Sequence, residues 1–405
     1  MLRRLMEYGR RTFGLDEATG RIRDGRTRRR IPTIRMVRSL FLMVCVRIGS
    51  LNALSQARSG GFGSRWLGGD VPSADALGDV AATLSLDDLR EEAYRQYQVL
   101  KRNKAIRPLP GGWLVLVLDG HESGASYLRP ASLQRTIPTA KGEKIQFYYR
   151  HVAALLLHAG GQVLLDVEPQ QPGEDEIAAA LRLWERVEGR YPRAFEVVAG
   201  DALYMNPGFC RRVRSQGKHF VVVLKNENRD LITDARSLFP LVQPVLWEHQ
   251  NVRYECWDVS DLTTWTQFGS PVRVVRSRET RSVRRQRTHE VETQTTEWLW
   301  ATSLPRDRAS TLAIVRIGHG RWTIENQGFN ELVNEWHADH IYKNHPHAIV
   351  ALLLMLFLAY NLFHALLTRN LKPALRKTYT PRFLADKIKA SFHGAVTLHA
   401  SARSP

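Results

Sequence analysis

Two carboxylates follow directly on short apolar runs, which is the pattern of acids placed at the ends of buried strands. Residues 113–118 precede Asp119, and residues 194–199 precede Gly200 and Asp201. A continuous apolar run indicates a central strand that is covered on both faces. Each acid alone is ordinary, since Asp-Gly and Gly-Asp are common turn dipeptides. As a pair they predict an acidic site at the edge of an α/β sheet, where the carboxyl ends of strands usually carry function.

A third acid, Glu325, lies in the segment 320–346, and Arg321 precedes it by one helical turn on the same face. Apolar residues recur at helical spacing further along this segment and predict a helix that is buried on one side. An acid on a buried helix is costly unless it is paired or binds a metal. Two interpretations are therefore open. Glu325 forms an ion pair with Arg321, or it completes a metal site with Asp119 and Asp201.

Three carboxylates of this kind suit Mg²⁺ or Mn²⁺, which prefer oxygen ligands. Two such ions, about 3.5–4 Å apart, can activate water or a 3′-hydroxyl and stabilise the leaving oxygen of a phosphodiester. The chain has 405 residues, with 58 Lys and Arg against 40 Asp and Glu, a net charge of +18. So basic a chain suits nucleic acid as its partner. A glycosidase that uses an acid pair would leave this charge unexplained.

The apolar pattern between residues 109 and 225 predicts the element order β-β-β-α-β-α-β. The predicted strands are 113–118, 145–158, 162–168, 194–199 and 219–224, and the predicted helices are 172–190 and 207–216. This order indicates an α/β fold with a mixed sheet that is flanked by helices.

Four further regions flank this core. Residues 1–108 are predicted to be helical and basic, which suits DNA contact, dimerisation or simply a solvated basic face. Residues 226–317 are rich in tryptophan and β-branched residues and predict an inserted antiparallel β subdomain. Residues 318–370 return to core helices and carry Glu325. Residues 371–405 form a basic tail that is expected to be peripheral or frayed.

Neither a membrane span nor a disulfide is predicted. The most apolar segment, 348–363, is short for a bilayer and contains Asn361, so a core helix is expected there. Cys45, Cys210 and Cys256 are far apart and have no zinc-site spacing. The N-terminus has no pattern of a signal peptide. A cytoplasmic protein that is associated with the nucleoid fits these features.

Residues 110–368 resemble the DDE transposases of bacterial insertion sequences, in the group with a β-rich insertion before the glutamate. The resemblance is carried by LDGHE at 118–122, by AGDALYMNPGFCRRVRSQGKHFVVVLKNEN from Ala199, and by RWTIENQGFNEL from Arg321. It implies a ribonuclease H-like core in which Asp119, Asp201 and Glu325 bind two divalent metal ions. Arg321 would orient Glu325 or contact phosphate. The expected activity is metal-dependent cleavage of double-stranded DNA at transposon ends and transfer of the 3′-hydroxyl into target DNA, by a homodimer or higher oligomer.

The sequence departs from the family pattern at two positions. Many relatives carry Tyr-x2-Arg-x3-Glu-x6-Lys around the glutamate, whereas here the Tyr position is Gly318 and the Lys position is Leu332. The phosphate clamp must then come from other side chains, and a hairpin intermediate is not implied. The candidate DNA-contacting residues are Lys225, Lys343, the loop residues Arg28, Arg29 and Arg30, the hairpin residues Arg284 and Arg285, and Trp298 for base stacking.

Several alternatives stay open at this stage. Glu122 could replace a member of the acidic triad if Glu325 is only the partner of Arg321. The histidines of residues 337–347, with Asp339, could bind a transition metal, although such a tract is more often polar surface or DNA contact. For the whole chain, the alternatives are a metal-dependent DNA nuclease on the same core and a non-catalytic DNA-binding remnant of a transposase.

Overall fold

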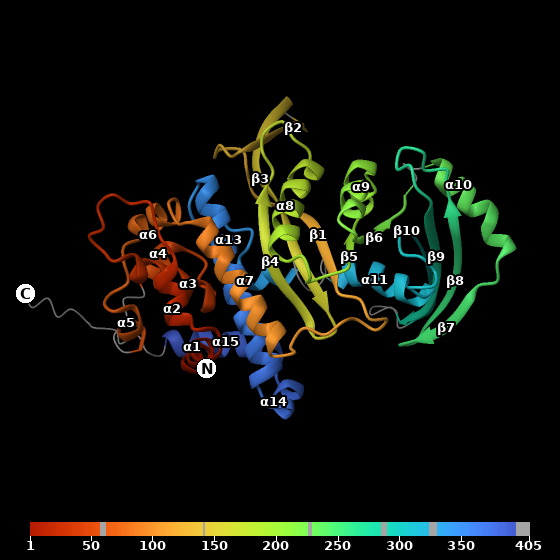
Figure 1. The fold of residues 1–405 in the computed structure, drawn as a ribbon. Coiled ribbons are helices and arrows are strands. Elements are labelled where there is room, and N and C mark those ends of the chain that lie inside the picture. Colours follow the sequence, from red (N-terminus) through yellow and green to blue (C-terminus); the bar gives the residue numbers. More distant parts are fainter. Residues whose placement is uncertain (57–61, 141, 226–228, 285–289, 324–329, 394–405) are drawn as a thin grey trace, which may run out of the picture.

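The computed structural model describes residues 1–56, 62–140, 142–225, 229–284, 290–323 and 330–393 (Figure 1). The N-terminal helices lie at one side of the molecule and the sheet at the other, with α13 (Pro346–Ala365) between them. Glu325 and Arg285, which the sequence singles out, lie outside the described residues.

The N-terminal region is helical, as predicted. Its helices are α1 (Leu2–Phe13), α2 (Leu15–Arg21), α3 (Thr33–Cys45), α4 (Leu51–Gln56), α5 (Phe62–Leu67), α6 (Ala74–Ala81) and α7 (Leu86–Arg102). Serine caps start two of them, because the hydroxyls of Ser73 and Ser85 accept hydrogen bonds from the first-turn amides of α6 and α7. α3 and α7 pack against α13 and so attach the region to the sheet.

Within the described residues, ten strands form one sheet. They are β1 (Val115–Ser126), β2 (Leu133–Thr139), β3 (Gly142–His158), β4 (Gly161–Pro169), β5 (Val197–Gly200), β6 (His219–Val223), β7 (Val245–His249), β8 (Val252–Leu262), β9 (Val272–Arg284) and β10 (Val291–Thr302). The order across the sheet is β2-β3-β1-β5-β6-β10-β9-β8-β7, and β4 also pairs with β3. Only β1, β5 and β6 run parallel to one another, so the predicted mixed α/β sheet is confirmed.

The structure differs from the predicted strand pattern in one strand end, in one additional strand and in how the antiparallel β-rich insertion joins the sheet. β1 does not end at Asp119, because its residues 120–126 continue to pair with β3. What ends near Asp119 is the parallel pairing with β5, whose last pair is Val117 with Ala199. β2 was not predicted, since its sequence LQRTIPT carries little apolar signal. Strands β7–β10 extend the central sheet, because β10 pairs with β6.

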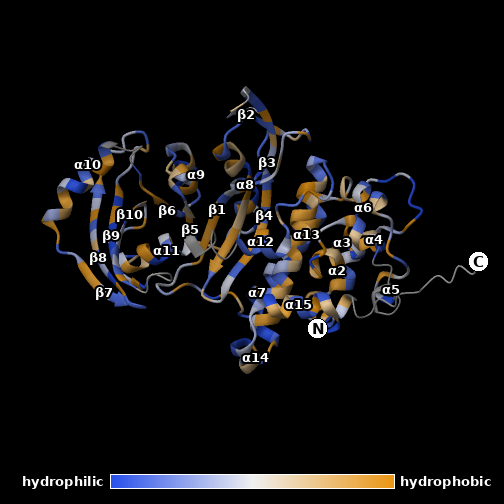
Figure 2. Ribbon diagram, turned by 180° about the vertical axis from the view of Figure 1, so that it is seen from behind, coloured by the Kyte–Doolittle hydropathy of each residue, from blue (hydrophilic) through white to orange (hydrophobic). Residues whose placement is uncertain are grey.

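Helices cover both faces of the sheet. α8 (Glu176–Arg190), α9 (Pro207–Ser215) and α10 (Arg229–Leu238) contribute to the core on one face, with Leu116 and Leu118 of β1. α11 (Thr311–Thr323), α12 (Asn330–Trp336) and α13 lie on the other face, with Val115 and Val117. This alternation explains the unbroken apolar run of β1, since both faces are buried. Figure 2 colours α13 largely orange, the hydrophobic end of its scale.

α13 is a core helix, as predicted. It is the one helix within the described ranges that is long and apolar enough to cross a membrane, and 89% of that apolar window is buried inside the protein. Its buried Asn361 donates to the carbonyl of Leu164 and accepts from the amide of the same residue, both at 2.9 Å. The side-chain amide thereby satisfies backbone groups of the edge strand β4.

The C-terminal tail, for which the sequence predicts a peripheral or frayed segment, is helical over its described part. α14 (Pro373–Thr378) and α15 (Pro381–His393) follow α13, and α15 packs on α1. Its residues Leu384, Ile388 and Phe392 are buried, at the helical spacing of one apolar face. Because basic side chains lie between these residues, the composition of the tail did not indicate an apolar face.

Candidate active site

The sheet brings Asp119 and Asp201 together. Val117 pairs with Ala199, and each aspartate lies two residues beyond these partners on adjacent parallel strands. Because side chains alternate along a strand, both aspartates point to the face that α11 and α13 cover. Adjacent strands are about 4.8 Å apart, so two carboxylates in one row can share a cation. The prediction that these two acids meet at one edge of the parallel strands agrees with this register.

Arg321 reaches the same place from α11. Its Nη1 lies 3.9 Å from Oδ2 of Asp119, and the side chains of Arg321 and Asp119 are 7% and 14% exposed. The N-terminal end of α11 is held as well, because the Thr311 hydroxyl donates to Oδ2 of the buried Asp258 at 2.6 Å. α11 therefore places the positive charge of Arg321 beside Asp119. The helix ends at Thr323, two residues before Glu325.

The donor set of this site fits a hard divalent cation in part. Two carboxylates on the same face of neighbouring strands supply the oxygen ligands that Mg²⁺ and Mn²⁺ prefer. Within the described ranges, no three His, Cys, Asp or Glu side chains gather closely enough to hold a metal ion. Since Glu325 lies outside these ranges, the pair Asp119 and Asp201 is the part of the predicted triad that the structure brings together.

Two DNA-contact candidates lie at the same edge of the sheet. Val223 pairs with Trp300, so the antiparallel register places Lys225 opposite Trp298, just past the end of β6. Both continue the row of side chains on the face of Asp119 and Asp201. Lys225 is exposed, and Trp298 stacks on Trp300 with ring centroids 6.3 Å apart. A cation and an aromatic ring therefore lie on the next two strands after β5, on the same face of the sheet as the acid pair.

The structure gives a physical reason for Gly318 at the position where many relatives carry tyrosine. A Cβ atom at Gly318 would lie 2.3 Å from the indole of Trp300, which is 1% exposed. No side chain fits between α11 and this tryptophan. Leu332, at the usual lysine position, is buried in the core and cannot reach a phosphate. The packing of α11 therefore leaves no room for a tyrosine at position 318, and the packing of α12 buries position 332.

The tight contact at Gly318 makes a testable prediction. Gly318→Ala is expected to lower the free energy of unfolding by about 1–2 kcal/mol, because the overlap with a fixed indole outweighs the better helix propensity of alanine. Gly189 on α8 is the matched control, since nothing lies within 4 Å of a Cβ built there. Gly189→Ala is expected to stabilise the protein slightly in the same urea titration. Equal effects of the two substitutions would contradict the packing argument.

The other predicted DNA contacts lie away from the acid pair. Arg28 and Arg30 are exposed on the loop before α3, and Arg29 pairs with Asp24 at 3.5 Å. Lys343 forms an ion pair with Asp79 of α6 at 2.8 Å. Arg284 is at the exposed end of β9, roughly 20 Å along the strand from the residue that pairs with Trp298. These cations are not part of the local site.

The rival site residues have other partners. Glu122 forms a bidentate ion pair with Arg135, with both distances 2.7 Å, and alternation along β1 directs it to the face opposite Asp119. His347 Nε2 lies 2.6 Å from the Leu84 carbonyl oxygen. The histidines of residues 337–347 are described, and with Asp339 they do not form a group that could hold a metal.

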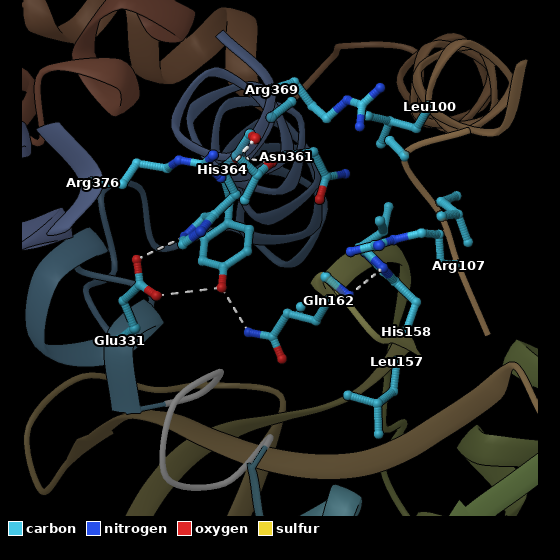
Figure 3. Close-up of a pocket in the computed structure, with 18 residues that line it drawn as sticks. Leu100, Arg107, Leu157, His158, Gln162, Glu331, Asn361, His364, Arg369 and Arg376 are labelled. Carbon is cyan, nitrogen blue, oxygen red and sulfur yellow. Dashed lines mark hydrogen bonds and ion pairs between the residues drawn. The ribbon is translucent and has the colours of Figure 1, made fainter. Parts of the chain in front are cut away.

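A separate cavity of about 280 Å³ lies between α7, the β3–β4 turn and α13 (Figure 3). In it, Gln162 donates to the hydroxyl of Tyr360 at 2.6 Å, and Tyr360 donates to Glu331 at 3.3 Å. Three arginines also line it: Arg107, Arg369 and Arg376. Leu157 at its wall is roughly 13 Å along β3 from the residue that pairs with Asp119. The cavity is therefore distinct from the acid pair.

Sequence reasoning missed two polar residues next to the aspartates. Glu176 at the start of α8 and Tyr204 just after Asp201 are both buried, and the Tyr204 hydroxyl donates to Glu176 at 3.1 Å. The only local signal was a glycine beside each aspartate, Gly120 and Gly200, which also suited an ordinary turn.

An acid pair on adjacent parallel strands, with a buried arginine beside it in a strongly basic chain, defines an α/β protein with a compact anionic site. The transposase DDE domain matches residues 114–362, more than half of the chain, and the chain belongs to this family. No curated protein matches it. Among solved structures, it is similar to the NurA nuclease from Sulfolobus solfataricus, at 10% identity over 57% of this chain and 83% of that one, with a TM-score of 0.27. A structural similarity this weak does not bear on the fold or function of the protein.

Proposed function

We propose that the protein is the DNA transposase of a bacterial insertion sequence, which cleaves transposon ends and transfers the 3′-hydroxyl into target DNA. The observation that carries the proposal is the register that puts Asp119 and Asp201 in one row, with Arg321 of α11 beside them. The family match and the net charge of +18 support a DNA substrate.

In the proposed mechanism, Asp119, Asp201 and Glu325 would hold two divalent ions, Mg²⁺ or Mn²⁺. When bound, such ions would supply activation of a water or 3′-hydroxyl and stabilisation of the charge on the leaving oxygen. Arg321 fixes the position of the Asp119 carboxylate and screens the charge of the acid cluster. Lys225 binds a backbone phosphate at the edge of the sheet, and Trp298 supports an unpaired base there.

The proposed partners are the two transposon ends and the target duplex, which a homodimer or higher oligomer holds in the cytoplasm. Residues 1–108 contact DNA or the second subunit. Residues 109–225 and 318–370 form the catalytic core, and residues 226–317 supply its β-rich part. Arg28, Arg30 and Arg284 are exposed and suit phosphate contacts outside the active site.

A strand-transfer assay tests this function. The protein is mixed with labelled DNA that carries the ends of its own element, a supercoiled target plasmid and Mg²⁺ or Mn²⁺. Joining of label to the plasmid is expected. Cutting of the labelled DNA without joining would assign the protein to the alternative class, a metal-dependent nuclease. Salt-sensitive DNA binding that is indifferent to metal, without any cutting, would identify a non-catalytic remnant.

A further inference from the structure

A buried carboxylate lies directly behind the acid pair, on the opposite face of the sheet. Glu176, at the start of α8, is 6% exposed. A Cβ atom at Gly120 would lie 2.1 Å from its Oε2 and 2.7 Å from its Oε1, so the carboxylate occupies the space that a side chain at Gly120 would need. Gly120 follows Asp119 in β1. Glu176 thus packs against the backbone of the strand at the point where Asp119 is presented.

Tyr204 makes the equivalent contact on the neighbouring strand. Its ring lies 2.6 Å from a Cβ atom built at Gly200, the residue before Asp201. Tyr204 also closes the short turn that Asp201 caps, since Oδ1 of Asp201 accepts from the amide of Leu203 at 2.9 Å. The Tyr204 hydroxyl donates to Oε1 of Glu176 at 3.1 Å. One hydrogen bond therefore joins the two side chains that pack behind Asp119 and Asp201.

The charge of Glu176 is balanced on the side away from the aspartates. Arg150 of β3 donates to Oε2 of Glu176 through Nη2 at 2.6 Å and Nε at 3.1 Å. Burial, together with the negative charges of Glu176, Asp119 and Asp201, holds the pKa of Tyr204 well above its usual range. Tyr204 therefore remains neutral and serves as a hydrogen-bond donor.

We propose that Glu176 and Tyr204 are positioning residues that set the distance between the Asp119 and Asp201 carboxylates for divalent-cation binding. This inference rests on the proposed function of the acid pair. The last parallel pair of β1 with β5, Val117 with Ala199, lies two residues before the aspartates, so the β1–β5 register does not extend to them. The Glu176–Tyr204 bond, whose two side chains pack on Gly120 and Gly200, links the two strands at that point. A cation site tolerates little change in ligand spacing, because Mg²⁺ requires near-ideal octahedral geometry.

The test compares Tyr204→Phe and Glu176→Gln with the wild-type protein. Binding of Mn²⁺ alone is measured by the loss of the free-ion signal in electron paramagnetic resonance, in the absence of DNA. Both variants are expected to bind Mn²⁺ about five- to tenfold more weakly and to need correspondingly more metal for half-maximal cleavage. Both should retain DNA binding at a fixed salt concentration.

Two matched controls separate positioning from loss of stability. Tyr191→Phe removes a buried tyrosine hydroxyl in the same core, and within the described residues that hydroxyl has no hydrogen-bond partner. Glu168→Gln neutralises a buried glutamate on the same face that pairs with Arg182 at 2.9 Å. Neither packs on Gly120 or Gly200, so both should leave Mn²⁺ affinity unchanged even where they lower the melting temperature.

Unchanged Mn²⁺ affinity in Tyr204→Phe and Glu176→Gln would overturn the inference, as would an equal loss in the controls. If either test variant fails to fold, the other decides the question. Failure of the proposed function is distinguishable, since Asp119→Asn would then leave Mn²⁺ binding intact as well. Weaker binding in Asp119→Asn alone would keep the acid pair as the metal site and reject the positioning role.

Discussion

Asp119→Asn and Asp201→Asn are each expected to reduce cleavage of transposon ends by about a thousandfold or more. Asparagine keeps the shape of the side chain but replaces a charged ligand with a neutral amide, so the site loses affinity for a divalent cation. A thousandfold loss corresponds to about 4 kcal/mol of transition-state stabilisation, within the several kcal/mol that a metal ion supplies to charge stabilisation. The measurement is the rate of cutting of labelled end DNA with saturating Mg²⁺.

The matched control for this prediction is Glu122→Gln. Glu122 is on the same strand and pairs with Arg135, but it points to the other face of the sheet. Its replacement should change the cleavage rate by less than threefold. DNA binding is measured alongside, at fixed salt, and should be kept by all three variants. Undiminished cutting by either aspartate variant would remove that residue from the active site.

The local sequence pattern predicted much of the strand arrangement around Asp119 and Asp201. The apolar run before Asp119 marked a strand covered on both faces, and the register of β1 with β5 then follows from ordinary parallel pairing. The run was less informative about where β1 ends. Residues 120–126 carry Gly and polar side chains, yet they pair with β3, whose own sequence is strongly β-forming. Partner strands decide strand length, and a single segment does not contain that information.

The supporting residues of the site could not be predicted in the same way. Glu176 meets Gly120 only because α8 crosses the face opposite Asp119 after the β3–β4 hairpin. The sequence shows Glu176 as an ordinary acid in the first turn of a helix, which a favourable interaction with the helix dipole would explain. The role of Gly318 could not be predicted either, because the side chain that packs against it, Trp300, comes from β10 and not from the neighbouring sequence.

α11 connects the β-rich part of the sheet to the acid pair. Its first residue, Thr311, bonds to Asp258 of β8, while Arg321 near its other end lies beside Asp119 of β1. Strands β8 and β1 are separated by four intervening strands in the sheet order. A change in how α11 is anchored at β8 is therefore transmitted along a rigid helix to the site. This gives residues 226–317 a structural role in addition to any contact with DNA.

Asp258→Ala is expected to lower the free energy of unfolding by about 3–5 kcal/mol, because it leaves a buried arginine without its counter-ion. Asp258 and Arg273 are 2% and 3% exposed. Arg273 donates to both carboxylate oxygens, with Nε at 2.8 Å and Nη2 at 2.5 Å. The variant also loses the bond that starts α11, so Arg321 is less well fixed. Denaturant unfolding measures the stability loss, and cleavage should fall at temperatures where the variant remains folded.

The pH dependence of stability provides a second measurement on the same carboxylate. Burial alone would raise the pKa of Asp258, but hydrogen bonds from Arg273 and Thr311 outweigh it and lower the pKa. A depressed pKa in the folded state means that this carboxylate stabilises the protein at pH values above its unfolded pKa, about 3.9. The contribution is lost as the pH falls through the lower, folded value. The stability difference between wild type and Asp258→Ala should therefore shrink below about pH 4.

Arg306→Ala is the matched control, since Arg306 approaches the same carboxylate at 3.7 Å from a side chain that is 58% exposed. Arg306→Ala should lower the free energy of unfolding by at most about 1 kcal/mol, because solvent screens the charge of an exposed arginine. The double variant Asp258→Leu/Arg273→Met should recover part of the stability, since both buried charges are then removed together. If the double variant is no more stable than Asp258→Ala, the loss comes from the contact with Thr311 and not from an unpaired arginine.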